Sequence, residues 1–336
     1  MKIIIPMAGR GSRLRPHTLT VPKPLVPIAG KPVVQRIVED LSTSFSGDIE
    51  EIAFIIGDFG DAVEQELLSI AEKMGAKGRI YYQDKPLGTA HAILCAADSL
   101  SGPCIVAFAD TLFQADFTFD PMAQDGIIWV QKVEDPSAFG VVKLDAEGCI
   151  TEFVEKSPVF VSDLAIVGIY FFKDGDNLKA ELQYLLDNEI KDKGEYQITS
   201  ALENMKAKGL RFHAGEIMEW LDCGNKDNVV HTNQRILDIK RETEQLVAED
   251  VVMENAVLRA PCYVGPGVVL RNAVVGPYVS IGSNSVVENS VIENGLIQNN
   301  SQVSKAVLNG FMIGNHVNYE GLQPNISIGD YTNYES

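Results

Sequence analysis

Short apolar runs alternate with amphipathic stretches along the first third of the chain. Runs of this length that end at polar or glycine residues are typical of buried strands. The predicted strands are Ile3–Ile5, Ile52–Ile56, Ile80–Gln83 and Ile105–Phe108. Between them, apolar residues recur at helical spacing. The predicted helices are Lys31–Leu41, Asp61–Met74 and Thr89–Ala97. This alternation predicts an α/β domain with a doubly wound, mostly parallel sheet covered by helices on both faces. Ligands of such sheets bind at the carboxyl ends of the strands.

A different period appears in the last quarter of the chain. From Val264 onward an aliphatic residue recurs at intervals of five or six, often followed by glycine or a small polar residue. The series is Val264, Leu270, Val275, Ile281, Val287, Ile292, Ile297, Val303, Leu308 and Ile313. It resembles the hexapeptide repeat of the left-handed parallel β-helix, in which each short strand buries one aliphatic side chain. Because the spacing drifts, we expect irregular coils.

These patterns divide the 336 residues into four parts, since the chain is longer than one usual domain. The predicted parts are an α/β domain at 1–230, a helical linker at 231–249, a β-helix at 250–318 and a cap or tail at 319–336. An exposed β-helix face readily packs against its own copy, so we expect a homo-oligomer.

Composition and charge exclude several classes of protein. The formal net charge is −18, and an acidic surface argues against a nucleic-acid partner because such binding depends on basic side chains. No apolar run approaches the roughly 20 residues of a membrane span. The five cysteines are scattered and form no Cys-x-x-Cys pair, so neither zinc nor a disulfide framework is expected. A reducing cytoplasm fits this usage.

The loop after the first predicted strand is cationic although the protein is acidic. It contains Gly9, Gly11, three arginines and Lys23, and seven Lys or Arg precede the first acidic residue, Glu39. Glycine allows backbone N–H groups to approach a ligand, and arginine matches phosphate oxygens. The loop therefore predicts a phosphate site, with Lys23 expected as an exposed side chain on a stiffened loop. The alternative is a glycine turn with solvated arginines.

Two common phosphate motifs do not fit this loop. Leu14 stands where the dinucleotide fingerprint needs a third glycine, and Pro32 stands where the phosphate loop of nucleoside triphosphatases needs Ser or Thr. The longer pattern G-x-G-x-R-L-x-P, followed by K-P-L-x-P, resembles the signature of the sugar-1-phosphate nucleotidyltransferases.

This resemblance assigns roles within the loop. It implies that the backbone at Ala8, Gly9 and Gly11 binds the nucleotide. It also implies that Arg13 holds the β- and γ-phosphates, and that Lys23 meets the charge that grows on the α-phosphate.

The segment from Gln83 to Ala90 is similar to the part of the family that binds the nucleobase. The Gln83 amide can donate and accept hydrogen bonds, which suits the imide edge of uracil or thymine. Gly88 permits close backbone approach, and the resemblance places Thr89 in the same nucleotide site. The alternative is a strand end followed by a turn and a helix capped by Thr89.

Two aspartates are the predicted metal ligands. Ala109-Asp110-Thr111 stands where the family has Gly-Asp-Asn or Gly-Asp-Thr, and the segment with Asp222 resembles its W-x-D-x-G pattern. The resemblance implies that Asp110 and Asp222 bind Mg²⁺, which proteins usually hold with one or two carboxylates plus substrate phosphates. The alternative for Asp110 is a residue that starts a turn.

The sugar half of the site is expected between these aspartates. An F-G-V segment and an E-K-S-P segment match the F-G-V and E-K-P segments of the family, with Ser157 inserted. The resemblance implies that Gly140 and Glu155 hold sugar hydroxyls, that Gly168 admits the sugar and that Lys156 holds the sugar phosphate. The alternative for Glu155 and Lys156 is an exposed charged turn.

The implied reaction transfers a nucleotidyl group from a nucleoside triphosphate to a sugar 1-phosphate and releases pyrophosphate. Gln83 favours dTTP or UTP, glucose 1-phosphate is the commonest acceptor in similar proteins, and Mg²⁺ is the cofactor. Two alternatives remain open: a guanylyltransferase that acts on mannose 1-phosphate, and a non-catalytic regulatory or scaffold subunit of the same fold.

Overall fold

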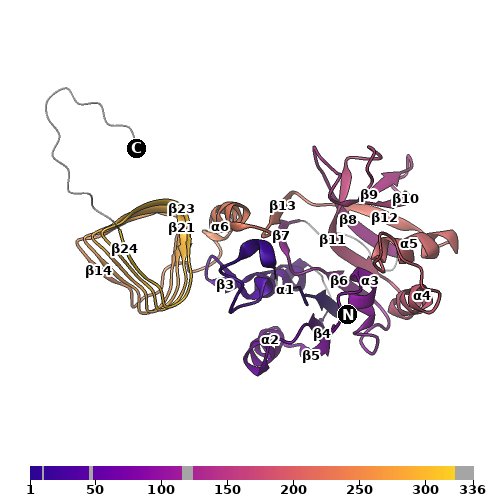
Figure 1. Cartoon of the computed structure of the whole chain (residues 1–336), viewed down its shortest axis with the longest axis horizontal. Coiled ribbons are helices and arrows are strands. Elements are labelled where there is room, and N and C mark those ends of the chain that lie inside the picture. Colours follow the sequence, from indigo (N-terminus) through magenta and orange to yellow (C-terminus); the bar gives the residue numbers. More distant parts are fainter. Residues whose placement is uncertain (10, 45–47, 116–123, 322–336) are drawn as a thin grey trace. The chain divides into compact units, whose positions relative to one another are not determined.

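The computed structural model describes residues 1–9, 11–44, 48–115 and 124–321. The chain forms two compact units (Figure 1). The first comprises Met1–Val26 and Lys31–Asn225, and the second comprises Pro27–Gly30 and the chain from Lys226 onward.

A nine-stranded mixed sheet forms the centre of the first unit. Its main path runs β10-β9-β11-β6-β1-β4-β5, while β8 joins β11 to β12. The strands are β1 (Lys2–Pro6), β4 (Glu51–Ile56), β5 (Lys77–Tyr82), β6 (Cys104–Ala107), β8 (Gly126–Lys132), β9 (Gly140–Leu144), β10 (Ile150–Glu155), β11 (Leu164–Phe172) and β12 (Phe212–Glu216). The four strands predicted from the first third of the chain are parallel to one another, and β11 adds to β6 in the antiparallel direction. The doubly wound core is thus confirmed, with an antiparallel extension.

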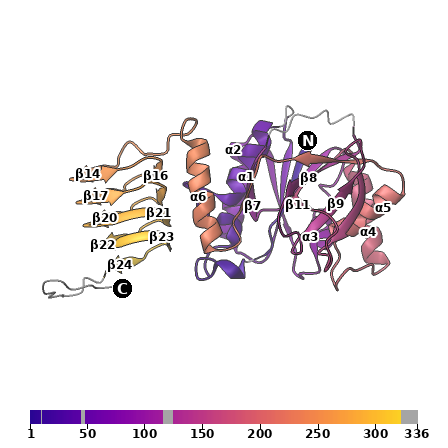
Figure 2. The same cartoon turned by 90° about the horizontal axis from the view of Figure 1, so that it is seen from above.

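Helices cover both faces of this sheet (Figure 2). They are α1 (Val33–Ser44), α2 (Asp61–Lys73), α3 (Thr89–Leu94), α4 (Gly175–Asp187) and α5 (Ile198–Ala207). The side chains of Ile4 and Ala53 belong to one buried cluster with those of α3, α4 and α5. Ile3 and Ile5 are also fully buried, and strand alternation directs them to the opposite face.

The order of the parallel strands creates a crevice at the end of β1. The chain proceeds from β1 to β4 and β5 on one side, and then returns to β6 on the other side of β1. At such a switch point the loops after the two central strands separate, and ligands bind between them. Here these are the loop after β1 and the segment that leads from β6 to β7 (Thr111–Gln114). A separate two-stranded sheet pairs β7 with β13 (Glu219–Asp222).

The second unit contains a left-handed parallel β-helix, as the repeat predicts. Its strands are β14 (Val252–Glu254), β15 (Val257–Leu258), β16 (Cys262–Val264), β17 (Val269–Arg271), β18 (Val274–Val275), β19 (Val279–Ile281), β20 (Val286–Glu288), β21 (Val291–Ile297), β22 (Gln302–Ser304), β23 (Val307–Ile313) and β24 (Asn318–Glu320). Val252 pairs with Val269 and Val286 pairs with Gln302, so successive coils take 17 and 16 residues. Each coil is therefore divided into intervals of five and six residues, which explains the drift in the repeat.

The β-helix unit also includes α6 (Lys226–Lys240), which begins before the predicted linker at 231–249. Asn233 is buried and its Oδ1 accepts hydrogen bonds from the Ala29 backbone N–H at 3.0 Å and from Ser280 Oγ at 2.7 Å. One amide therefore joins the helix, a β-helix coil and a short segment from early in the sequence. Of the predicted cap or tail at 319–336, residues 322–336 lie outside the described residues.

Among the described residues, none of the helices combines the length and the apolar character needed to cross a bilayer.

Candidate functional site

A cavity of about 340 Å³ opens at the carboxyl ends of the central strands of the first unit. Its volume lies within the range of small-molecule sites. It collects nine of the predicted site residues: Ala8, Gly9, Gly11, Arg13, Lys23, Gln83, Gly88, Thr89 and Asp110. The other five do not line it: Gly140, Glu155, Lys156, Gly168 and Asp222.

Lys23 is buried, which corrects the expectation of an exposed loop side chain. It begins a 3-10 helix, Lys23–Leu25, and its side chain is 8% exposed. Gly11 has φ +73°, and a Cβ there would lie 2.6 Å from Cβ of Lys23. The Lys23 ammonium lies 3.8 Å from Oδ2 of Asp110, whose side chain is 61% exposed. Gly11 thus makes room for the lysine stem, and among the described residues the partly hydrated carboxylate of Asp110 faces its charge.

The rest of the cationic loop is held by its own backbone. Gly11 O accepts hydrogen bonds from the Leu14 N–H at 3.0 Å and from Thr18 Oγ1 at 2.8 Å. Arg13 is exposed and lines the cavity, whereas Arg10 lies outside the described residues. A Cβ at Gly9 would meet no atom within 4 Å, so the backbone there is open to a ligand.

The predicted nucleobase segment packs closely against the start of α5 and is hydrogen-bonded to it. Gly88 has φ +117°, and a Cβ there would lie 2.4 Å from the carbonyl oxygen of Tyr196. Thr89 does not cap α3, because the cap position is Gly88. Instead its hydroxyl donates to Oε1 of Gln197 at 3.0 Å and accepts from the Ile198 N–H at 2.9 Å.

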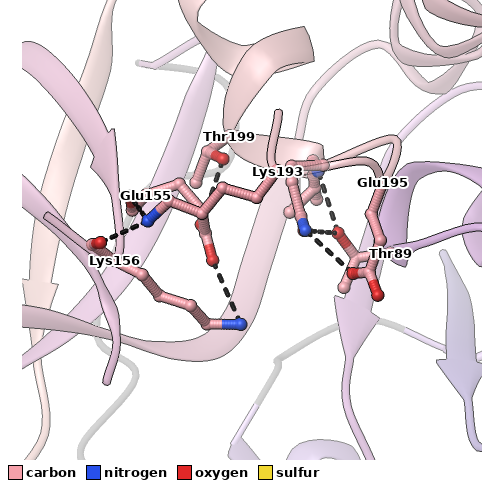
Figure 3. A network of polar contacts seen from close by, with 8 residues as sticks. Thr89, Glu155, Lys156, Lys193, Glu195 and Thr199 are labelled. Atoms are coloured by element: carbon pink, nitrogen blue, oxygen red, sulfur yellow. Dashed lines mark hydrogen bonds and ion pairs between the residues drawn. The ribbon is translucent and has the colours of Figure 1, made fainter. Parts of the chain in front are cut away.

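Glu155 and Lys156 form a second polar group at the end of β10 (Figure 3). Oε2 of Glu155 accepts a hydrogen bond from Thr199 Oγ1 at 3.1 Å, and Oε1 lies 3.6 Å from the Lys156 ammonium. Lys193 donates to the backbone carbonyls of both Glu155 and Lys156. A Cβ at Gly140 would lie 3.0 Å from Oε2 of Glu155, so this glycine adjoins the carboxylate.

Gly168 lies behind the wall of the cavity. It falls within an irregular part of β11, where pairing with β8 shifts between Ile166 and Tyr170. Its carbonyl accepts from the Phe108 N–H at 3.0 Å, and a Cβ would lie 3.5 Å from the Phe108 side chain. Because Phe108 lines the cavity, Gly168 contacts that wall from outside.

Asp110 and Asp222 lie on neighbouring segments. Asp222 ends β13 and pairs with Thr111 of β7, and the Cys223 N–H donates to the Asp110 carbonyl at 3.3 Å. These are hard oxygen ligands of the kind that Mg²⁺ prefers. Among the described residues there is no cluster of three or more His, Cys, Asp or Glu side chains that could hold a metal ion. A pair of carboxylates fits Mg²⁺ when phosphate oxygens complete the coordination.

Three residues near the cavity have no predicted role. Phe108 and Glu195 line it, and His91 contacts Gln83, with 3.1 Å between Nδ1 and Nε2. Oε2 of Glu195 accepts from Nε2 of Gln197 at 3.0 Å. These contacts join residues that lie in separate segments or on opposite sides of a turn. Hydrophobic periodicity and motif spacing do not predict contacts of this kind.

Comparisons with known proteins agree with this architecture. The nucleotidyl transferase family model matches residues 2–239. A low-salt glycan biosynthesis nucleotidyltransferase of Haloferax volcanii is 31% identical, over 86% of this chain and 85% of that protein. A glucose-1-phosphate thymidylyltransferase of Streptomyces griseus is 27% identical over 94% and 93% of the two chains. The solved structure of a UDP-glucose pyrophosphorylase in complex with UDP-glucose covers 71% of this chain and 98% of its own, with a TM-score of 0.58. At 24% identity this last likeness shows the fold alone.

The contact at Gly88 yields a stability prediction. In Gly88→Ala the new methyl group meets the Tyr196 backbone and the residue keeps a positive φ, so we expect a loss of about 3 kcal/mol in the free energy of unfolding. Gly209→Ala is the matched control, because Gly209 has φ +100° but open space around it. It should lose about 1 kcal/mol, the cost of the backbone conformation alone. Equal losses in the free energy of unfolding of the two variants, measured by denaturant titration, would contradict close packing of Gly88 against the Tyr196 backbone.

Proposed function

The chain belongs to the nucleotidyl transferase family, and we propose that it transfers a nucleotidyl group from dTTP or UTP to glucose 1-phosphate and releases pyrophosphate. One observation carries this proposal: a buried lysine, an arginine, open glycine backbone, an amide and an aspartate line one cavity at the switch point of the sheet. Cations and backbone N–H groups suit a triphosphate, and the amide suits a base edge. The name of the Streptomyces griseus relative supports thymidylyl transfer to glucose 1-phosphate.

The reaction is a displacement at the α-phosphorus. An oxygen of the sugar phosphate forms a bond to this phosphorus, while the bond from phosphorus to the bridging oxygen breaks and pyrophosphate leaves with that electron pair. Arg13 would hold the β- and γ-phosphates, Lys23 would face the charge on the α-phosphate, and Lys156 would hold the incoming phosphate. The contribution of these side chains is positioning and charge neutralisation, as in other phosphoryl transfers.

The residues proposed for the metal and the sugar also act by positioning and by charge neutralisation. Asp110 and Asp222 would hold Mg²⁺ together with substrate phosphates, and Mg²⁺ when bound supplies neutralisation between the two anions. Glu155 would bind sugar hydroxyls with a carboxylate already oriented by Thr199. Gly140 would leave room for this carboxylate, and Gly168 would act on the sugar site through its contact with the Phe108 wall.

Pyrophosphate release tests the proposal. Purified protein with Mg²⁺ should release pyrophosphate with UTP or dTTP plus glucose 1-phosphate, and omission of the sugar phosphate should abolish the signal. A preference for GTP with mannose 1-phosphate would support the guanylyltransferase alternative instead. No release with any triphosphate and sugar phosphate, in a protein that binds nucleotide, would favour the non-catalytic alternative.

The charge of Lys23 should be needed for turnover. Lys23→Met keeps most of the buried stem beside Gly11 and removes the ammonium, so we expect kcat to fall by about 10²–10³-fold, as for one preorganised donor. Lys179→Met is the control, because Lys179 lies on α4 and pairs with Asp176. Near-normal kcat in folded Lys23→Met, judged by circular dichroism, would contradict this role.

The two aspartates should control the requirement for Mg²⁺. Asp110→Asn and Asp222→Asn should each raise the Mg²⁺ concentration at half-maximal rate, because a neutral amide is a weaker ligand for a hard cation. Asp98→Asn, on the exposed surface, should leave this concentration unchanged. An unchanged Mg²⁺ titration for either site variant would remove that residue from the proposed metal site.

Self-association would use the β-helix. Val257, Val291 and Val307 occupy the same row of one face and are 54%, 47% and 85% exposed. An exposed row of aliphatic side chains is typical of an interaction surface. Light scattering should therefore show an oligomer that Val307→Lys weakens, whereas Val252→Lys on another row should not. A monomeric wild-type protein would contradict this proposal.

A cytoplasmic location completes the proposal. The five cysteines are scattered along the sequence and form no Cys-x-x-Cys pair. Thiols stay reduced in the cytoplasm, whereas secretory compartments favour disulfides.

A further inference from the structure

The side-chain amide of Gln83 is held by two neighbours. Gln83 lines the cavity directly after β5. Its Nε2 donates to the carbonyl oxygen of Gly88 at 3.3 Å and lies 3.1 Å from Nδ1 of His91. His91 is in the first turn of α3, so both neighbours belong to the segment that follows Gln83 along the chain.

The Gly88 carbonyl determines which end of the Gln83 side-chain amide faces it. A carbonyl oxygen can only accept, so the amide nitrogen and not the amide oxygen must face it. An amide nitrogen carries two hydrogens, and its second donor then points to His91. Nδ1 of His91 accepts this hydrogen bond when the ring proton is on Nε2. Burial lowers the pKa of His91, which favours the neutral ring near pH 7. An amide flipped by 180° would place Oε1 against the Gly88 carbonyl oxygen, which can only accept.

This arrangement leaves Oε1 as the atom of Gln83 that can meet a ligand. Oε1 only accepts, so its partner must carry a hydrogen. Uracil and thymine carry an N–H at ring position 3, whereas cytosine has a bare nitrogen there and adenine has one at position 1. Guanine carries an N–H at position 1, so an Oε1 that faces this ring nitrogen accepts a hydrogen bond from uracil, thymine or guanine and meets a lone pair in cytosine or adenine. A site built around one hydrogen-bonding direction rejects the opposite pattern strongly, because buried polar atoms would be left unpaired.

We propose that His91 is a positioning residue that selects the nucleobase, because it holds the Gln83 amide with Oε1 toward the cavity. The ligand class is then a nucleoside triphosphate whose base edge carries a ring N–H. This inference rests on the proposed function, in which Gln83 binds the base, and it adds the residue that fixes the direction of that contact.

UTP and CTP form a matched pair of probes, because they share ribose and triphosphate and differ only at the base edge. We would measure kcat/KM for each with glucose 1-phosphate in the wild type and in His91→Ala, His91→Leu and His91→Asn. The first two variants lack the acceptor, and leucine keeps more of the side-chain volume if alanine destabilises the fold. Asparagine keeps an acceptor oxygen within similar reach.

The expected result is a ratio of UTP to CTP that falls by about 5- to 10-fold in His91→Ala and His91→Leu and recovers in His91→Asn. This size corresponds to one neutral hydrogen bond, since the Gly88 carbonyl still favours the original direction. A purely structural role for His91 would lower both values together and leave the ratio unchanged. An unchanged ratio, or an equal fall in His91→Asn, would overturn the proposal.

Gln83→Ala separates this inference from the proposed function. A changed ratio in Gln83→Ala with unchanged ratios in all His91 variants would retain base binding by Gln83 and reject the role of His91. An unchanged ratio in Gln83→Ala, with transfer still measurable, would reject base binding by Gln83 and the inference with it. Absence of transfer with every triphosphate would reject the proposed function itself.

Discussion

The buried ammonium of Lys23 is the interaction on which the candidate site depends. A charge removed from water is stable only when other charges or donors replace the lost hydration. Asp110, at 3.8 Å and 61% exposed, replaces part of it. An anionic ligand in the cavity would replace more, so the cost of burial in the free protein favours phosphate binding. Gly11 is needed because only a residue without a Cβ leaves room for the lysine stem.

The segment from Lys193 to Thr199 connects the two halves of the candidate site (Figure 3). On one side, the Thr89 hydroxyl bonds to the start of α5. On the other, Thr199 bonds to the Glu155 carboxylate, and Lys193 bonds to the carbonyls beside it. One short stretch of backbone therefore positions both the predicted nucleobase segment and the predicted sugar segment. Such shared support suits a displacement in which two substrates must meet in line.

In the first third of the chain, local patterns were sufficient to locate the strands and helices and insufficient to predict the packing between them. The apolar runs located β1, β4, β5 and β6, and helical spacing located α2 from its first residue, Asp61. The burial of Lys23 could not be predicted, because it depends on a glycine twelve residues earlier and on Asp110 from the segment between β6 and β7. The Thr89 hydroxyl likewise bonds to residues more than a hundred positions away. The roles of the site residues remain predictions, because their functional partners are substrates.

Stereochemistry at the α-phosphorus tests the central claim most directly, namely that these side chains position the substrates and neutralise charge without forming a covalent bond. The reaction of one diastereomer of an α-thio analogue of UTP with glucose 1-phosphate would be followed by phosphorus NMR of the nucleotide-sugar. A single in-line displacement inverts the configuration, and inversion is the expected result. Retention requires two displacements through a covalent nucleotidyl-enzyme, and it would contradict a mechanism based on positioning alone.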